Sequence, residues 1–515
     1  MNLNRGLHTP TAAPSLPVHL LGTRQPAKQL LESLERETTC LTELPDVAPP
    51  LGLLRGENGS VRCNGRPAQC QQHPDTASSC SSKEDSSAEK GSSGARLRPW
   101  CVALLVFLLL SALGAGLGVP LVLDATRPST HQERLQVVRR LLRDVPLVDG
   151  HNDLPWNVRK FVHNQILGFN LSADLRRVEP WSRSNWSHTD IPRLRRGMVG
   201  AQFWSVYVPC GAQHLDAVQL TLEQIDLVKR LAELNPGHLT HVTTVRGLTE
   251  AHRAGRVASL IGVEGGHSLG NSLAVLRTFY SLGARYMSVT HTCDTAWADC
   301  SVGEESLPAS GVRRRSGLTE FGKLVVREMN RLGMMVDLSH ASVGTMRDAL
   351  AASKAPVIFS HSSAFALCNS SRNVPDDILR LVALNRGIVM VNFYTYFITC
   401  NSTATIYDVI AHVNHIRSVA GIDHVGIGAG YDGINYTPQG LEDVSKYPDL
   451  LARLMEDESW TEEDLKKLAG LNILRVFKEV EETRYKWQLA AVTPVEELIP
   501  LSALDGHTAC MYIGS

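Results

Sequence analysis

Short apolar runs, rich in β-branched and aromatic residues, alternate with amphipathic stretches from about residue 135 onward. Repeated strand–helix units of this kind predict a parallel sheet covered by helices. Helical periodicity is clearest at residues 220–234, 318–332 and 375–384. The strand-like runs number eight and lie at residues 146–150, 199–208, 257–263, 284–290, 334–339, 356–360, 387–394 and 424–428. Eight units favour a closed (β/α)8 barrel of TIM type, although an open doubly wound sheet would show the same alternation.

The first hundred residues lack this periodicity and are rich in Pro, Ser, Thr, Gln and Gly. A stretch such as residues 75–98 holds too few apolar residues to offset the entropy lost on ordering. We therefore expect a disordered tail at 1–99, the barrel at 124–490 and a C-terminal extension at 491–515.

Between the tail and the barrel lies an uninterrupted uncharged run, CVALLVFLLLSALGAGLGVPLVL, at residues 101–123. As a helix with a rise of about 1.5 Å per residue, it exceeds the roughly 30 Å hydrocarbon core of a membrane. The run predicts a transmembrane signal-anchor at 100–123. Cleavage after a small residue between Ala112 and Gly118 is the alternative, and it would release the rest of the chain.

The composition is that of an ordinary globular protein, with 43% hydrophobic residues, 20% charged residues and a net charge of −1. This balance gives no sign of a nucleic-acid partner. Six of the eleven cysteines follow the apolar run, as do five Asn-x-Ser/Thr sequons, at Asn170, Asn185, Asn369, Asn401 and Asn435. Sequons also arise by chance, but together these features favour a single-pass membrane protein whose barrel is extracellular or luminal and glycosylated.

Residues of metal-binding type follow successive strand-like runs. In a barrel the carboxyl ends of the strands meet at one face, where functional residues gather. These residues are His151 and Asp153 after the first run, Glu264 after the third, His291 after the fourth, His340 after the fifth and His361 after the sixth. Their positions support a barrel over a random scatter of histidines.

Five of these residues form a plausible ligand set for two divalent ions. His151 and Asp153 are two residues apart, so in extended backbone both point to the same side. Glu264 ends a buried run, where a carboxylate is costly unless it is paired or coordinated, and it could bridge two ions. His340 and His361 each end an apolar run in the same way. Nitrogen and oxygen ligands without thiolate suit zinc, manganese or iron, and we expect two Zn²⁺ ions and a hydrolytic reaction.

From about Arg134 to Cys510 the chain resembles the membrane (renal-type) dipeptidases, zinc enzymes of the amidohydrolase superfamily. The motifs that carry the resemblance are VDGHNDLPW, GAQFWSVYVPC, SLIGVEGGHS, VTHTCDTAWAD, VDLSHAS, PVIFSHSSA, RNVPDD and QGLEDVSKYPDL. The resemblance implies that a metal-bridging hydroxide hydrolyses dipeptides and cysteinyl-glycine conjugates such as leukotriene D4.

The resemblance also implies roles for individual residues. His151 and Asp153 would bind one zinc ion, His340 and His361 the other, and Glu264 would bridge them. His291 and Arg372 would contact substrate, His291 at the oxyanion and Arg372 at the C-terminal carboxylate. The implied disulfides are Cys210–Cys293 and Cys368–Cys400, and Cys510 would join two subunits of a homodimer.

Two features depart from the family pattern. Relatives carry two aspartates after the last strand, the first of which binds the substrate amine and moves a proton, whereas this chain reads GIGAGYDG with Gly430 in that place and only Asp432 left. Three interpretations stay open: an inactive metal-binding homologue, an enzyme in which Asp432 is catalytic instead, or a variant of an active enzyme. We expect zinc binding to survive and turnover to be weakened.

The second departure is at the C-terminus. Relatives end in a hydrophobic tail that is exchanged for a lipid anchor, and this chain ends in HTACMYIGS. We therefore expect the N-terminal span to anchor the protein. A receptor-like membrane protein that keeps the barrel only as a binding scaffold is the non-enzymatic alternative.

Overall fold

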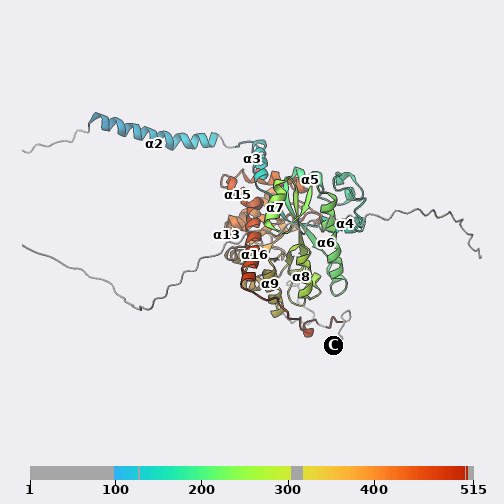
Figure 1. Cartoon of the computed structure of the whole chain (residues 1–515). Coiled ribbons are helices and arrows are strands. Elements are labelled where there is room, and N and C mark those ends of the chain that lie inside the picture. Colours follow the sequence, from blue (N-terminus) through green and yellow to red (C-terminus); the bar gives the residue numbers. More distant parts are fainter. Residues whose placement is uncertain (1–97, 126–127, 303–316, 505, 509–515) are drawn as a thin grey trace, which may run out of the picture. The chain divides into compact units, whose positions relative to one another are not determined.

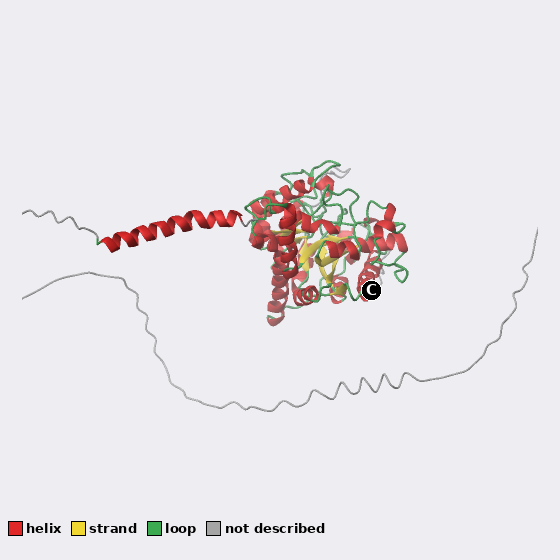
Figure 2. Ribbon diagram, turned by 90° about the horizontal axis from the view of Figure 1, so that it is seen from above, coloured by secondary structure: helices red, strands yellow, loops and turns green. Residues whose placement is uncertain are grey.

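The computed structural model describes residues 98–125, 128–302, 317–504 and 506–508. Within the barrel, parallel strands lie at the centre and helices surround them (Figure 2). The eight strands of the ring are β1 (Leu147–Asn152), β2 (Val199–Tyr207), β4 (Val257–Glu264), β5 (Ala284–Ser288), β6 (Met335–Asp337), β7 (Ile358–Phe359), β8 (Ile388–Val391) and β9 (Val425–Ile427). The ring closes because β1 pairs with both β2 and β9, and β2 pairs with β4. The predicted (β/α)8 barrel is confirmed.

A further short strand, β3 (Leu239–His241), lies outside the ring and was not predicted. It pairs in parallel with the first three residues of β4, from Val257 to Ser259, while the later part of β4 pairs with β5. Its sequence, LTH, is too short to show periodicity. It therefore extends the sheet only at the amino end of β4, away from the strand ends that carry the predicted site.

Helices cover the ring from outside, as the labels α4, α6, α8, α9, α13 and α16 show in Figure 1. The helices predicted at 220–234, 318–332 and 375–384 coincide with α6, α9 and α11. The α-helices of the described barrel are α3 (His131–Asp144), α4 (Leu154–Val162), α5 (Ile191–Arg196), α6 (Ala217–Leu234), α7 (Val245–Arg253), α8 (Leu273–Ser281), α9 (Glu320–Leu332), α10 (Val343–Ala352), α11 (Asp376–Asn385), α12 (Thr395–Ile398), α13 (Ile406–Ala420), α14 (Tyr447–Leu454), α15 (Glu462–Lys466) and α16 (Asn472–Leu489).

Helix α9 shows how local sequence sets these boundaries. It begins where the Thr319 side chain accepts a hydrogen bond from the Gly322 backbone N–H, and it ends at Gly333, whose φ of 78° favours glycine. One face, with Val325 and Met329, is fully buried. The amphipathic pattern thus packs the helix on the barrel.

The strands are buried on both faces, which is why they read as apolar runs and not as alternating ones. Side chains from different strands, including Val148, Phe203, Tyr286 and Met390, pack together in one cluster. The barrel is therefore filled by packed side chains, and the residues of metal-binding type lie at the strand ends.

Helix α2 (Pro99–Ala125) forms where the membrane span was predicted, and its large apolar side chains between Val102 and Leu113 are exposed. Among the described residues, however, no helix is found that is long and apolar enough to cross a membrane. The span at 100–123 is therefore not confirmed. The tail at 1–99, apart from its last two residues, and Cys510 lie outside the described residues.

Candidate metal centre

The five predicted metal ligands come together at the carboxyl ends of the strands. His151 lies in β1 and Asp153 directly follows it, Glu264 is the last residue of β4, and His340 and His361 lie just beyond β6 and β7. All five are buried. His340 has a φ of 70°, a conformation that costs a residue with a side chain on the order of 1–3 kcal/mol.

Glu264 is at the centre of the cluster. Its Oε1 lies 3.2 Å from His340 Nε2 and 3.6 Å from His361 Nε2, and its Oε2 lies 3.5 Å from His151 Nε2. Oε2 also accepts a hydrogen bond of 2.8 Å from the Ser205 hydroxyl. The two carboxylate oxygens thus face two groups of nitrogen atoms, as a bridging ligand requires.

The nitrogen atoms converge in a way that hydrogen bonding alone does not explain. The Nε2 atoms of His340 and His361 are 3.0 Å apart. Buried His151 Nε2 makes no hydrogen bond, although it lies 3.2 Å from Asp153 Oδ2. Lone pairs and carboxylates turned toward a common space are the arrangement that binds a divalent cation. The five residues therefore fit a metal site.

At this cluster, two three-residue groups bring their ligand atoms within 4.8 Å of one another: His151, Glu264 and His361, and Glu264, His291 and His340. The resemblance divides the histidines differently, with His340 and His361 on one ion. Glu264 belongs to both groups in either division. The geometry therefore fits two cation positions that share this carboxylate.

The electrostatics keep two of the nitrogen ligands, His340 and His361, neutral and the central carboxylate charged. Burial alone would lower the pKa of His151, but the charges of Glu264 and Asp153 outweigh it and raise that pKa well above its usual value. Burial holds the pKa of His340 and of His361 well below the usual value. Burial alone would raise the pKa of Glu264, but the positive charge of His151 outweighs it and holds that pKa well below its usual value. At neutral pH two imidazoles thus offer lone pairs beside an ionised glutamate.

A layer of hydroxyl groups behind the histidines was missed by the sequence analysis. His151 Nδ1 lies 3.1 Å from the hydroxyl of Tyr286, and His361 Nδ1 lies 2.8 Å from that of Ser360. Ser360 in turn donates to Asp337 Oδ2 at 2.7 Å. Asp337 was the one available signal, because an acidic residue inside the apolar run VDLS needs a partner.

His291, predicted to contact substrate, follows β5 and reaches the same space. Its Nε2 lies 3.6 Å from Glu264 Oε1, and burial lowers its pKa to about 4, so the ring is neutral. The confirmed disulfide Cys210–Cys293 closes the loop that carries it, with a Cα–Cα distance of 5.9 Å. A neutral imidazole held here can donate a hydrogen bond to a reacting oxygen.

Arg372, the other predicted substrate residue, is buried beside the cluster. Its Nη2 donates to His361 O at 3.2 Å and its Nη1 lies 3.4 Å from Ser362 Oγ. Its Nε has no hydrogen-bond partner among the described residues. Burial lowers the pKa of Arg372 to about 10, which still leaves a cation at neutral pH. A buried arginine that has no carboxylate partner in the described part of the chain is suited to hold the carboxylate of a ligand.

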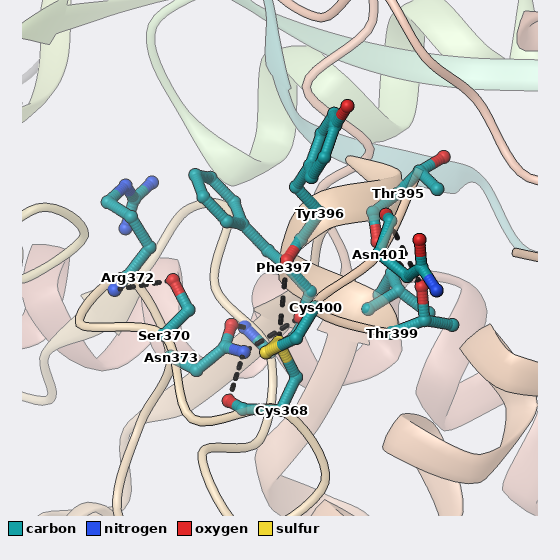
Figure 3. Close-up of a disulfide and its surroundings, with 12 residues drawn as sticks. Cys368, Ser370, Arg372, Asn373, Thr395, Tyr396, Phe397, Thr399, Cys400 and Asn401 are labelled. Carbon is teal, nitrogen blue, oxygen red and sulfur yellow. Dashed lines mark hydrogen bonds between the residues drawn. A yellow bond between two sulfur atoms is a disulfide. The ribbon is translucent and has the colours of Figure 1, made fainter. Parts of the chain in front are cut away.

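A second confirmed disulfide, Cys368–Cys400, braces the segment that carries Arg372 (Figure 3). In the same view, Asn373 Nδ2 donates to Cys368 O at 2.9 Å and to Phe397 O at 2.7 Å. The segment after β7 is thus tied to α12, which follows β8.

The carboxylate of Asp432 makes its hydrogen bonds to residues other than the five ligands. Its carboxylate accepts a hydrogen bond from the hydroxyl of Thr189 and one of 3.3 Å from Asn157 Nδ2. Burial raises the pKa of Asp432 to about 7. Its expected catalytic role stays a prediction, and these contacts favour a structural role.

Gly430 lies directly at the candidate site. Its backbone N–H donates to His151 O at 3.1 Å, and its φ is 75°. A Cβ atom placed here would meet nothing closer than Ile434 Cγ2, at 3.8 Å. The position therefore has room for a side chain, but its left-handed backbone conformation is unfavourable for residues other than glycine.

The five sequons all lie in the described barrel. Asn170, Asn185, Asn369 and Asn401 are exposed, and Asn435 is half-buried. Four of the five positions are thus accessible to a glycosylating enzyme, and glycosylation itself stays a prediction.

Comparison with known proteins identifies relatives of this chain. Residues 135–491 match the model of a family described as membrane dipeptidase (peptidase family M19). The chain is 47% identical over 360 residues to Dipeptidase 3 of Rattus norvegicus, an alignment that covers 70% of each protein.

Two solved structures are also similar. A metallopeptidase of Rhodobacter sphaeroides, solved with a phosphinate mimic of the dipeptide L-Ala-D-Ala, is 26% identical with a TM-score of 0.56, and the match covers 65% of this chain and 99% of that one. A metallopeptidase named dipeptidase AC, of family M19, is 27% identical with a TM-score of 0.57 over the same shares.

Proposed function

The chain belongs to the membrane dipeptidase family, peptidase family M19, and we propose that it hydrolyses dipeptides with two zinc ions. His151 and Asp153 hold one ion, His340 and His361 the other, and Glu264 is common to both. The observation that carries this proposal is the convergence of three buried Nε2 atoms on the carboxylate of Glu264.

The protein's own side chains would bind and orient the peptide around that centre. When bound, divalent ions in such a site lower the pKa of water and polarise a carbonyl group. Neutral His291 donates a hydrogen bond to the carbonyl oxygen as negative charge develops on it. Arg372 clasps the C-terminal carboxylate in a two-pronged contact. This clasp requires a free carboxylate one residue beyond the scissile bond, as every dipeptide has, and so excludes substrates whose C-terminus is blocked.

Cysteinyl-glycine conjugates such as leukotriene D4 belong to the same substrate class, because they end in a glycine carboxylate one residue beyond the bond. We include them in the proposal. Comparing hydrolysis of leukotriene D4 and of its glycine amide tests whether the free carboxylate is required.

The test of the main proposal removes and restores the metal. Purified protein treated with a chelator should lose dipeptide hydrolysis and regain it with Zn²⁺, and elemental analysis should find two ions per chain. His340→Ala should abolish turnover, whereas His163→Ala, at an exposed position, should not. Two bound ions without turnover of any dipeptide would contradict the proposal.

For the cellular setting, we propose that residues 100–123 anchor the protein in a membrane with the barrel outside. Support comes from the uncharged run, the exposed leucines of α2 and the accessible sequons. External protease on intact cells should cleave the barrel, and an endoglycosidase should lower its apparent mass. A barrel protected from protease would contradict this orientation.

The proposed homodimer rests on Cys510 and on the resemblance. Cys510→Ser should convert a disulfide-linked dimer to a monomer in a non-reducing gel. The same monomer pattern from the unaltered protein would contradict the proposal.

A further inference from the structure

The hydroxyl group of Tyr286, on β5, contacts two groups of β1, a backbone carbonyl oxygen and the ring of His151, and it can donate only one hydrogen bond. That hydroxyl is 3.0 Å from Gly150 O and 3.1 Å from His151 Nδ1. A carbonyl oxygen can only accept, so the phenol proton goes to Gly150. His151 Nδ1 must then carry the proton of its own hydrogen bond. In the neutral form of His151, the form that binds a metal ion, the lone pair is left on Nε2, the nitrogen that faces Asp153 and Glu264.

The hydroxyl group of Ser360 makes an equivalent pair of contacts behind His361. Its hydroxyl is 2.7 Å from Asp337 Oδ2 and 2.8 Å from His361 Nδ1. Asp337 also accepts from the Ser288 hydroxyl at 2.5 Å and from the backbone N–H groups of Ser339 and Ser360. With three other donors already facing its oxygens, Asp337 accepts here as well, so the Ser360 hydroxyl donates to it. His361 Nδ1–H then donates to Ser360, and its Nε2 lone pair also faces Glu264.

The phenol of Tyr286 reaches His151 only because β4 has a glycine opposite it. Gly262 pairs with Tyr286 across the two strands, and a Cβ atom on Gly262 would lie 2.0 Å from Tyr286 Cζ. The ring therefore occupies the space that any larger residue would fill. Both residues are buried, so the ring has no alternative position in solvent.

We propose that Tyr286 and Ser360 are positioning residues for the metal centre, each fixing its histidine with the proton on Nδ1 and the Nε2 lone pair turned to the ion. This inference rests on the proposed function, because it assumes that His151 and His361 bind metal. The two hydrogen-bond chains behind the histidines differ in the group at which they end. The hydrogen-bond chain from His361 through Ser360 ends on a carboxylate, whereas the chain from His151 through Tyr286 ends on a neutral carbonyl oxygen. Hydrogen bonds to charged groups are about twice as strong as those between neutral groups. Ser360 therefore contributes more to metal affinity than Tyr286.

The experiment measures metal affinity in Tyr286→Phe, Ser360→Ala and Asp337→Asn. Metal-free protein is titrated with Zn²⁺ against a chromophoric chelator, and Co²⁺ absorption spectra report the coordination. Outer-shell changes of this kind weaken metal binding by about 10–100-fold. In Tyr286→Phe we expect a loss of affinity of this size for one of the two zinc ions. In Ser360→Ala we expect a larger loss for the other zinc ion. Asp337→Asn, which keeps the shape and removes the charge, should fall between Ser360→Ala and the unaltered protein.

Matched controls separate positioning from stability. Tyr431→Phe removes a buried phenol that donates to Leu441 O at 2.8 Å, and Ser353→Ala removes a buried hydroxyl that donates to Ala355 O at 2.7 Å. Both should lower the melting temperature and leave zinc affinity unchanged. If Tyr286→Phe and Ser360→Ala behave like these controls, the inference is wrong.

The outcome also distinguishes this inference from the proposed function. Weakened zinc binding in the variants, with no dipeptide turnover by the unaltered protein, would overturn the function alone. Normal turnover with unchanged zinc affinity in every variant would overturn the inference alone. An unaltered protein that binds no zinc would overturn both.

Discussion

The guanidinium carbon of Arg372 lies 5.4 Å from the centre of the Phe397 ring, so the cation is stacked on an aromatic face next to the metal centre. This contact, with the hydrogen bond to His361 O, fixes the plane of the guanidinium group. A fixed planar fork matches a carboxylate better than a flexible ammonium group does.

Arg372→Lys should therefore raise KM for dipeptides by about tenfold or more, with a smaller effect on kcat, since the loss of one charge-assisted contact costs about 1.5–3 kcal/mol. Steady-state kinetics with a dipeptide and its C-terminal amide measure the effect. The unaltered protein should bind the amide as poorly as the variant binds the free acid. Equal KM values for the acid in both proteins would show that Arg372 does not hold the carboxylate.

Gly430→Asp should increase dipeptide turnover. The site has room for the side chain, and aspartate tolerates a φ of 75° better than most residues. A carboxylate at this strand end could take up a proton during attack, a contribution typically worth about 10²–10⁴-fold. Gly430→Asn, with the same shape and no basic group, is the control. Equal kcat values for the unaltered protein and for Gly430→Asp would show that the missing aspartate does not limit the rate.

Asp432 predicts a specific pH dependence of stability. Burial raises the pKa of Asp432 to about 7, whereas the unfolded chain has a pKa near 3.9. Between these values the folded state binds the extra proton, so this residue's contribution to stability falls as pH rises from about 4 to about 7. Asp432→Asn removes that dependence.

Thermal unfolding of the metal-free protein at pH 5 and pH 8 checks this. The melting temperature of Asp432→Asn relative to the unaltered protein should be higher at pH 8 than at pH 5. Asp216→Asn, at an exposed helix start, should show no such difference. A difference of the opposite sign would mean that Asp432 is ionised in the folded protein over this range.

The two disulfides should have separable effects on catalysis. Replacing Cys368 and Cys400 by serine frees the segment that carries Arg372 and should mainly raise KM. Replacing Cys210 and Cys293 frees the His291 loop and should mainly lower kcat. With sequence separations of 32 and 83 residues, each loss should cost about 3–5 kcal/mol of unfolding free energy. Identical kinetic effects from both pairs would contradict this division.

Much of the barrel could be predicted because its strands are buried on both faces and its ligands directly follow them. His340 and His361 were found from sequence since each ends an apolar run. The short strand β3 was not, because three residues show no period.

The contacts behind the ligands could not be predicted. Whether Tyr286 or Ser360 points at a histidine depends on strand register, and serine and tyrosine carry no distinctive pattern. The placement of Asp432 beside Thr189 and Asn157 depends on how α4 and the segment before α5 pack on the strand ends.

The close fit of Tyr286 over Gly262 links two positions that are distant in sequence but adjacent in the barrel. During divergence, neither residue can change size alone without disturbing the ring that supports His151. Homologous chains should therefore vary together at these two positions, glycine with an aromatic residue or a larger residue with a small one. A homologue with a larger residue at the position of Gly262 and a small one at that of Tyr286 would need another group to orient the histidine that corresponds to His151. This pair of positions therefore divides relatives by how they support that metal ligand.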